Sequence, residues 1–237
     1  DTPGKTFRDE IHPEYKGTRK ETPSALIEQL EDIYTIVAAL GIPVIMRSGI
    51  EADDIIGTIA VKAKNNGQKI LIATGDKDFA QLVDDDITLI NTMTNEVLDH
   101  AGVVNKFLVT PSQIIDYLSL VGDKVDNVPG VDKCGPKTAV KWLTEYGNLD
   151  TIIANSDKIG GVVGENLRKA VPWLATAKIL VTIDTELSLE AINLSHLNDL
   201  ICKAPNPDTL LECYTRLGFR TWLNEITRDF KNVDSQL

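Results

Sequence analysis

Acidic side chains gather in three short clusters, and each cluster directly follows an apolar segment. The clusters are Glu51, Asp53 and Asp54 after residues 43–46, Asp76 and Asp78 after residues 70–73, and Asp123 and Asp126 after residues 114–121. In an open α/β sheet, the carboxyl ends of the strands converge on one crevice, where ligands bind. A chain with this pattern is therefore expected to bring seven carboxylates together.

Seven neighbouring carboxylates would repel one another strongly. At a spacing of ~4 Å and an effective dielectric constant of ~20, each close pair costs about 4 kcal/mol. Hard divalent cations remove this cost, and Mg²⁺ in proteins is held by a few carboxylates together with substrate phosphates. Two such ions can clamp the attacking and leaving oxygens of a phosphodiester. The clusters therefore predict metal-dependent phosphoryl chemistry that uses two Mg²⁺ or Mn²⁺ ions.

Each cluster also has a purely structural interpretation. Acidic residues at 51–54 complement the dipole of a helix that begins there. Asp76 can serve as an N-cap residue, and Asp123 with Asp126 can form a capped turn. These alternatives stay open for each cluster taken alone.

Composition narrows the classes of protein. The chain has 237 residues, of which 43% are hydrophobic, and a formal net charge of −11. No apolar run reaches the ~18 residues of a membrane span, so we expect no membrane partner. The three cysteines lack metal-ligand spacing and indicate reduced thiols in a cytoplasmic protein. Because the overall charge is negative, DNA binding would need local basic patches.

The predicted fold class is α/β, a parallel sheet with flanking helices followed by a mostly helical part. Helical spacing covers 24–40 and ends at Gly41, and strands are expected at 43–47, 69–74 and 87–91. We expect an α/β core at 1–98 with a basic segment near 5–22, a helical part at 99–230, and the start of a linker at 231–237. Strand–helix alternation is typical of crossover connections between parallel strands.

Two segments suit nucleic acid. Basic residues are in surplus in the first twenty positions, with Tyr15 among them as a base-stacking candidate; the alternative is an exposed flexible segment. The loop 130–135 leads into a helix that begins at Pro136 and carries Lys137. Free N–H groups at such a helix start can bind a backbone phosphate. The alternative there is an ordinary helical hairpin.

Taken jointly, these motifs resemble the 5′-nuclease domain of bacterial DNA polymerase I and the wider flap-endonuclease family. The resemblance covers nearly the whole chain, from Asp1 to about Trp222. The matching motifs are Asp1-x-x-Gly4-Lys5-Thr6-Phe7-Arg8, Tyr15-Lys16-x-x-Arg19, Glu51-Ala52-Asp53-Asp54, Thr74-Gly75-Asp76-Lys77-Asp78 and Gly122-Asp123-x-x-Asp126-Asn127-x-Pro129-Gly130.

The resemblance implies a 5′→3′ exonuclease and flap endonuclease that acts in replication and repair on DNA with a 5′ flap or nick and on RNA–DNA primer junctions. It implies metal ligands at Asp1, Glu51, Asp53 and Asp54 for one ion, and at Asp76, Asp78, Asp123 and Asp126 for the other. Catalysis is expected to use Lys16, Arg19, Asp54 and Asp76. DNA binding is expected at Lys5, Arg8, Tyr15, Lys16, Arg19, Gly130, Gly135, Lys137 and Thr138, within a helix–three-turn–helix at about 111–147. We also expect a monomer, polymerase domains C-terminal to it, and K⁺ in the 130–135 loop.

Two departures from the family pattern matter. The opening strand, with its catalytic Asp, is missing before Asp1, so we expect an N-terminally truncated domain with impaired cleavage. Lys133 stands where the family has a glycine. If this position needs a positive φ, lysine there costs about 1 kcal/mol or more.

Two other functions compete with this interpretation. The first alternative is a fragment that binds branched DNA without cutting it. The second is a phosphatase of the haloacid-dehalogenase type, since Gly75-Asp76-Lys77-Asp78 superficially suits one. That chemistry needs an Asp-x-Asp nucleophile after a first strand, where this chain has none.

Overall fold

The structure is a computed structural model that describes the backbone of residues 4–234 and the side chains of residues 4–228. It contains two compact units, residues 1–19 with 47–188 and residues 20–46 with 189–237. We call them unit 1 and unit 2. The first nineteen residues and the segment 20–46 therefore belong to different units. The division expected at 98/99 stays a prediction. No described helix is long and apolar enough to cross a membrane.

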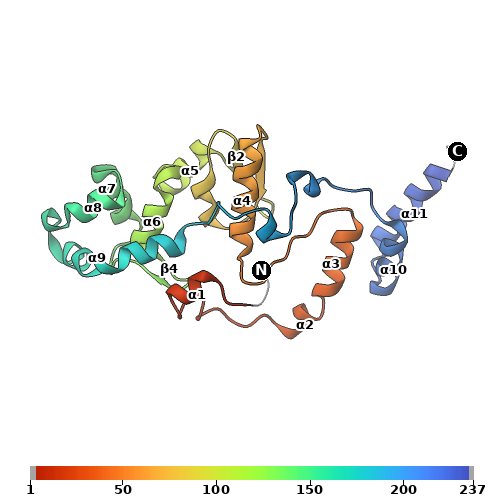
Figure 1. The fold of residues 1–237 in the computed structure, drawn as a ribbon, viewed down its shortest axis with the longest axis horizontal. Helices are drawn as coiled ribbons and strands as arrows, with labels where there is room; N and C mark the ends of the chain where they lie inside the picture. Colours follow the sequence, from red (N-terminus) through yellow and green to blue (C-terminus); the bar gives the residue numbers. More distant parts are fainter. Residues whose placement is uncertain (1–3, 235–237) are drawn as a thin grey trace. The chain divides into compact units, whose positions relative to one another are not determined.

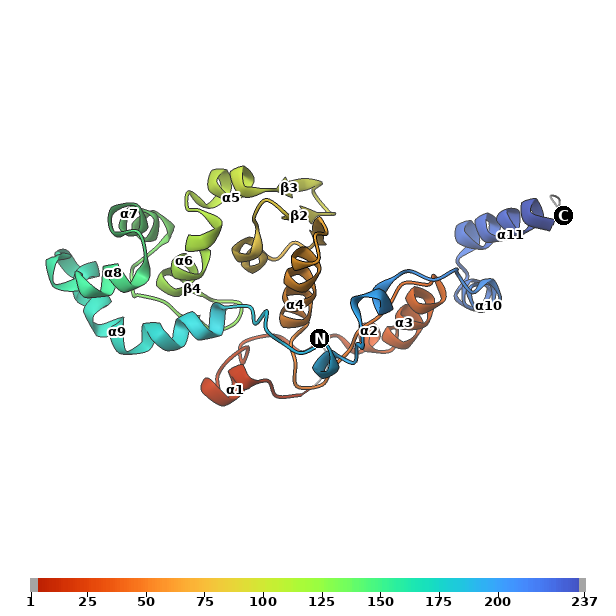
Figure 2. The ribbon, with the colours of Figure 1, turned by 45° about the horizontal axis from the view of Figure 1, so that its top comes forward.

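Unit 1 contains the sheet and most of the helices (Figures 1 and 2). Its elements are α1 (Phe7–Ile11), α4 (Ala52–Asn65), β1 (Ile70–Ala73), η1 (Lys77–Leu82), β2 (Ile87–Asn91), β3 (Glu96–Leu98), α5 (His100–Phe107), η2 (Pro111–Gln113), α6 (Ile114–Val121), β4 (Gly122–Asp123), β5 (Val128–Pro129), α7 (Pro136–Tyr146), α8 (Leu149–Ala154), η3 (Ser156–Lys158) and α9 (Gly161–Val181). In both views α7, α8 and α9 lie together at the opposite end of this unit from the sheet.

The sheet has three strands in the order β1-β2-β3. β1 runs parallel to β2, with Ile70 opposite Ile87, and β2 runs antiparallel to β3, with Leu89 opposite Leu98. The parallel pair confirms the predicted sheet, whereas β3 was not predicted. Because β1 and β2 are parallel, the loop that follows Ala73 leaves from the carboxyl edge of the sheet.

One apolar core runs through unit 1 from the sheet to the last helix. Phe79, Leu118 and Leu167 are each at most 2% exposed within it. Local sequence signals explain where its helices begin and end. Gly135 is the extended N-cap of α7 with Pro136 at N1, and Gly147 follows its last turn at φ +85°. Proline at the first helical position and glycine after the last turn are the usual boundary residues.

Unit 2 consists of helices from two distant parts of the chain. Its elements are α2 (Ser24–Ile27), α3 (Leu30–Ala39), η4 (Glu190–Ile192), η5 (Leu197–Leu200), α10 (Pro207–Leu217) and α11 (Arg220–Asp234). Ala39 of α3 packs with Leu210 and Tyr214 of α10 in a small core. Gly41 follows the end of α3, with φ +79°. Its backbone carbonyl oxygen accepts a hydrogen bond from Lys203 N at 2.8 Å. The predicted role of Gly41 at this helix end is confirmed.

Three sequence expectations need correction. The helix expected over 24–40 is interrupted between Ile27 and Leu30. The strand expected at 43–47 is absent: Val44 and Met46 are 40% and 47% exposed, and no described strand lies beside them to supply ladder hydrogen bonds. The linker expected from residue 231 is helical through Asp234, because no Gly or Pro interrupts α11.

Candidate metal and nucleic-acid site

Carboxylates from separate elements of unit 1 line two cavities that share three residues. The first has a volume of about 20 Å³ and includes Glu51, Asp53, Asp78, Asp123 and Asp126 in its lining. The second, of about 350 Å³, includes Asp76 and the same Asp78, Asp123 and Asp126. We call the two cavities together the acidic groove. The structure thus brings together the predicted metal ligands other than Asp54 and Asp1, and Asp1 lies outside the described residues.

Each carboxylate is placed by a local structural feature. Glu51 is the N-cap of α4, and Asp53 lies in its first turn. Asp76 is the N-cap of η1, and its Oδ1 accepts from Asp78 N at 3.0 Å. Asp123 is the last residue of β4 in the tight β4–β5 hairpin, and its Oδ1 accepts from Val125 N at 2.7 Å. The structural interpretations of the clusters are therefore correct as well, because the same residues cap helices and turns and line the groove.

Crowding and burial disturb the titration of these carboxylates. Burial raises the pKa of Asp78 to about 7, with Asp76 and Asp123 adding to the rise and Lys77 opposing it. Burial also raises the pKa of Asp53, helped by the charge of Asp76. For Asp123, burial is outweighed by the hydrogen bond and charge of Lys77, so its pKa lies below the usual range. The groove thus holds more negative charge than it can easily accommodate.

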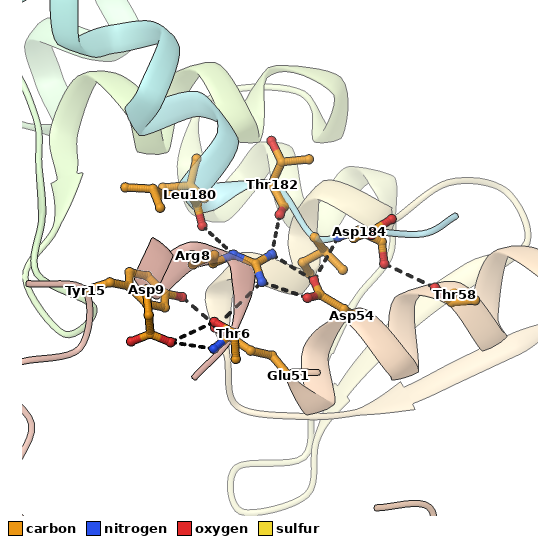
Figure 3. Close-up of polar contacts among 12 residues, drawn as sticks. Thr6, Arg8, Asp9, Tyr15, Glu51, Asp54, Thr58, Leu180, Thr182 and Asp184 are labelled. Atoms are coloured by element: carbon orange, nitrogen blue, oxygen red, sulfur yellow. Dashed lines mark hydrogen bonds and ion pairs between the residues drawn. The ribbon is translucent and has the colours of Figure 1, made fainter. Parts of the chain in front are cut away.

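Asp54 is not among the residues that line the acidic groove, and its carboxylate is held by Arg8 (Figure 3). Arg8 Nη1 and Nη2 donate to the two carboxylate oxygens of Asp54 at 2.7 and 2.8 Å. The same guanidinium donates to the carbonyls of Leu180 and Thr182, at 3.0 and 2.6 Å. Both charged side chains are 3% exposed. In this structure, Arg8 and Asp54 form a structural clamp.

Two of the side chains predicted to bind DNA are buried in this structure. Arg8 was expected to bind DNA, but its side chain is 3% exposed and its hydrogen bonds go to Asp54 and to the carbonyls of Leu180 and Thr182. Tyr15 was expected to stack on a base, but its ring is 5% exposed and packs in the core. Its hydroxyl donates to Asp126 Oδ2 at 3.0 Å. Both side chains are turned inward, where carboxylates accept hydrogen bonds from their donors.

Lys16 and Arg19 lie at the edge of the acidic groove and pair with its carboxylates. Lys16 Nζ donates to Glu51 Oε2 at 2.6 Å, and Arg19 Nη2 donates to Asp126 Oδ1 at 2.5 Å. Lys16 N also donates to Asp126 O at 2.9 Å, so the backbone itself is fixed to the hairpin. The side chains are 20% and 43% exposed. Both can therefore reach a ligand that enters the groove.

The donor set of the groove fits a hard divalent cation. Its acidic side chains offer carboxylate oxygens, which are the ligands that Mg²⁺ and Mn²⁺ favour. Asp78 Oδ1 is buried and accepts no hydrogen bond, although Lys77 Nζ lies 3.3 Å away. Within residues 4–228, however, no three acidic, His or Cys side chains are arranged around one point as metal ligands. Instead, several of these carboxylates form ion pairs with lysine and arginine side chains.

Models of two protein families match the chain in succession. Residues 1–108 match "5′-3′ exonuclease, N-terminal resolvase-like domain", and residues 109–208 match "5′-3′ exonuclease, C-terminal SAM fold". A 5′-3′ exonuclease of Aquifex aeolicus is 38% identical over 100% of this chain and 79% of its own length. The chain belongs to the 5′-3′ exonuclease family. This membership decides against the phosphatase alternative and makes the chain a member of a family of phosphodiester-hydrolysing nucleases.

Two further relatives add to this assignment. DNA polymerase I of Pseudomonas aeruginosa is 42% identical over 98% of this chain, and the chain spans only 26% of that protein's length. The flap endonuclease of bacteriophage T5, solved with DNA and metal ions, aligns with a TM-score of 0.69 at 25% identity, over 89% of this chain and 81% of the phage protein. The predicted α/β core, followed by a mostly helical part, is thus confirmed.

The helical part of this exonuclease-family chain carries the second group of predicted site residues. Lys137 is exposed in the first turn of α7, and Thr138 N donates to Gly135 O at 3.0 Å. Gly135 has open space around its Cα, whereas Gly130 packs against the backbone of Gly122. Lys5, near the start of the described chain, is exposed. Gly130 is therefore required by the fold, while the other residues are free to contact a ligand.

Sequence reasoning missed two features of the family site. It treated Lys77 only as part of the motif around Asp76 and Asp78, although its ammonium group contacts Asp78 and Asp123. It also did not foresee the clamp between Arg8 and Asp54. A lysine between two aspartates after a strand is a usable signal for the first feature. The second depends on packing between residues 46 positions apart, which no local pattern shows.

Proposed function

We propose that this chain hydrolyses phosphodiester bonds at the 5′ ends and 5′ flaps of DNA and in RNA primers, with two Mg²⁺ or Mn²⁺ ions as cofactors. The acidic groove carries this proposal. It gathers carboxylates from α4, η1 and the β4–β5 hairpin, and it has basic side chains at its edge. Such a combination suits a phosphate group, which needs both metal ions and positive side chains to offset its charge.

The chain's own carboxylates are the proposed ligands. Glu51 and Asp53 face the first cavity, Asp76 faces the second, and Asp78, Asp123 and Asp126 face both. A bound divalent cation would lower the pKa of water and stabilise the charge of the reacting phosphate. Asp54 orients Arg8 and the start of α4 instead of binding an ion directly. This assignment replaces the catalytic role first given to Asp54.

Lys16 and Arg19 are the proposed phosphate-binding residues. In the structure, their charges are balanced by Glu51 and Asp126. If Glu51 and Asp126 bind metal ions instead, the side chains of Lys16 and Arg19 become available to phosphate oxygens. Arginine can bind phosphate with two parallel hydrogen bonds, and lysine binds it as a point charge. We therefore assign them to the strand that is cut rather than to the duplex.

The start of α7 is the proposed contact with the duplex. Its first N–H groups and the exposed Lys137 can bind a backbone phosphate without reading sequence. Gly135 and Thr138 flank this contact. K⁺ held by carbonyls of the 130–135 loop remains a prediction, and Lys133 at φ +62° lies within that loop. Polymerase domains in the native chain, a monomeric state and action in the bacterial cytoplasm are parts of the same proposal.

A cleavage assay with a single conservative variant tests this function. Asp76→Asn keeps an acceptor for Asp78 N, so the N-cap and the fold should be retained, while one negative charge is lost. With 5′-flap DNA and Mg²⁺, we expect cleavage to fall by about a hundredfold or more, the usual size for a lost transition-state contact. Glu96→Gln, which removes an exposed carboxylate paired with Lys106, is the control and should cleave normally.

The assay also separates the competing possibilities. If the unmodified chain cleaves and Asp76→Asn does not, the result supports a nuclease in which the groove is the active site. Tight binding of flap DNA with no cleavage at any Mg²⁺ or Mn²⁺ concentration would favour a fragment that only binds branched DNA. Unchanged cleavage by Asp76→Asn would remove the acidic groove from the mechanism.

A further inference from the structure

Lys77 lies inside the acidic groove, between two carboxylates that it contacts directly. It follows β1, at the start of η1, and is flanked by Asp76 and Asp78. Its ammonium group donates to Asp123 Oδ2 and lies 3.3 Å from Asp78 Oδ1. Asp78 and Asp123 belong to different elements, so one lysine side chain connects η1 to the β4–β5 hairpin.

The two oxygens that Lys77 contacts have no other partner among the described residues. Asp123 Oδ1 accepts from the backbone N–H groups of Val125 and Asp126, which leaves Oδ2 to Lys77. Asp78 Oδ1 is buried and accepts no hydrogen bond. These are the oxygens that remain available to a cation, and the ammonium group stands between them.

The Lys77 side chain also has room to leave this position. Its side chain is 42% exposed, whereas that of Asp123 is 5% exposed. The lysine stem can therefore swing toward solvent while the carboxylates stay where the hairpin and η1 hold them. An ammonium group is strongly hydrated and compact, which favours such an exchange.

We propose that Lys77 is a built-in counter-cation: its ammonium group occupies the position between Asp78 Oδ1 and Asp123 Oδ2 in the metal-free protein, and a divalent cation must displace it to bind there. Lys77 thereby keeps the two carboxylates in place when no metal is present, and it lowers the affinity of this half of the groove for metal. The proposal rests on the proposed function, because it assumes that the groove binds divalent cations.

Lys77→Met tests this role, since methionine retains much of the side-chain length without the charge. We expect Mn²⁺, titrated calorimetrically into the protein without DNA, to bind Lys77→Met at least about tenfold more tightly than the unmodified chain, because a competing charge within ~4 Å is removed. In EDTA, the melting temperature of Lys77→Met should be lower than normal, because Asp78 and Asp123 then repel without compensation. Saturating Mn²⁺ should abolish this difference.

Lys69→Met is the matched control. Lys69 is paired with Asp86 outside the groove, and its side chain is 77% exposed. It should change neither the Mn²⁺ affinity nor the dependence of the melting temperature on Mn²⁺. Equal Mn²⁺ affinity of Lys77→Met and the unmodified chain would overturn the proposal. Absence of Mn²⁺ binding by the unmodified chain would instead overturn the proposed function.

A measurement on the unmodified chain keeps the proposal testable if Lys77→Met does not fold. In protein labelled with ¹⁵N-lysine, the ammonium resonance of Lys77 should move toward that of a solvent-exposed lysine as diamagnetic Mg²⁺ is added, whereas the resonance of Lys69 should stay unchanged. A Lys77 resonance that is unaltered at saturating Mg²⁺ would refute displacement. Loss of flap-DNA affinity in Lys77→Met with unchanged Mn²⁺ affinity would show a phosphate-binding lysine instead.

Discussion

Arg8 and Asp54, 46 residues apart, form a two-pronged ion pair whose partners are both almost completely buried. The pair attaches the short first helix to the start of α4. A third bond, from Asp184 N to Asp54 Oδ1 at 2.8 Å, connects the segment after α9 to the same carboxylate. Three distant parts of unit 1 therefore meet at one side chain.

Asp54→Ala should lower the free energy of unfolding by about 3–5 kcal/mol, because it leaves the Arg8 guanidinium buried without its partner. Urea denaturation in EDTA measures this without interference from metal. Glu96→Gln removes the exposed pair with Lys106 and should cost less than about 1 kcal/mol. Equal stability of Asp54→Ala and the unmodified chain would show that the clamp does not stabilise the fold.

Gly130 should not tolerate a side chain. A Cβ there would lie 2.4 Å from both Gly122 N and Val121 C, and these backbone atoms cannot move independently. We expect Gly130→Ala to cost about 1–3 kcal/mol or more, as for other overpacked sites. Gly135 has no atom within 4 Å of such a Cβ, so Gly135→Ala should melt within a few degrees of the unmodified chain. Similar melting temperatures for the two variants would contradict this assignment.

Lys133 has a left-handed backbone conformation, at φ +62°. This conformation costs a side-chain-bearing residue about 1 kcal/mol. Lys133→Gly should therefore raise the free energy of unfolding by up to about 1 kcal/mol. Lys124→Gly is the control, because Lys124 is exposed and is not among the described residues with positive φ, so glycine there only adds flexibility to the unfolded chain. A Lys133→Gly protein less stable than Lys124→Gly would refute the strain.

The raised pKa of Asp78, about 7, should appear in the pH dependence of stability. Because the folded protein holds this proton more tightly than the unfolded chain, the carboxyl contributes stability at low pH that is lost as pH rises from about 4 to 7. Relative to the unmodified chain, Asp78→Asn should therefore be more stabilising at pH 8 than at pH 5 in the metal-free protein. Thermal unfolding in EDTA at both values measures it, and parallel pH profiles would disprove the shift.

The sequence predicts those elements of the fold that carry their own boundaries. α7 is delimited by Pro136 and Gly147, and β1 by the turn before it and Gly75 after it, so local chemistry suffices for both. β3 has only three residues, Glu96–Leu98, too few to show a period of two. The segment 43–47 has strand-forming residues, but a strand also needs a neighbour, and that requirement is not visible in a local pattern.

The candidate site divides in the same way. The position of Asp76 after a strand and that of Asp123 before a hairpin follow from glycine and proline nearby, so their convergence was predictable. The inward turn of Tyr15 was not, because it depends on the carboxylate of Asp126, far away in sequence. Spacing along the sequence shows which side chains can share a surface, but it does not show which cationic group pairs with each carboxylate.

Unit 2 joins two segments that are synthesised at very different times. Arg216 of α10 donates to Asp32 of α3, and these residues are 184 positions apart. At a translation rate of ~5–20 residues per second, α3 would leave the ribosome about 10–40 s before α10 follows it. Residues 47–188 of unit 1 are all synthesised within that interval. During synthesis, the apolar face of α3 therefore stays unpaired until its partner helix α10 has been made.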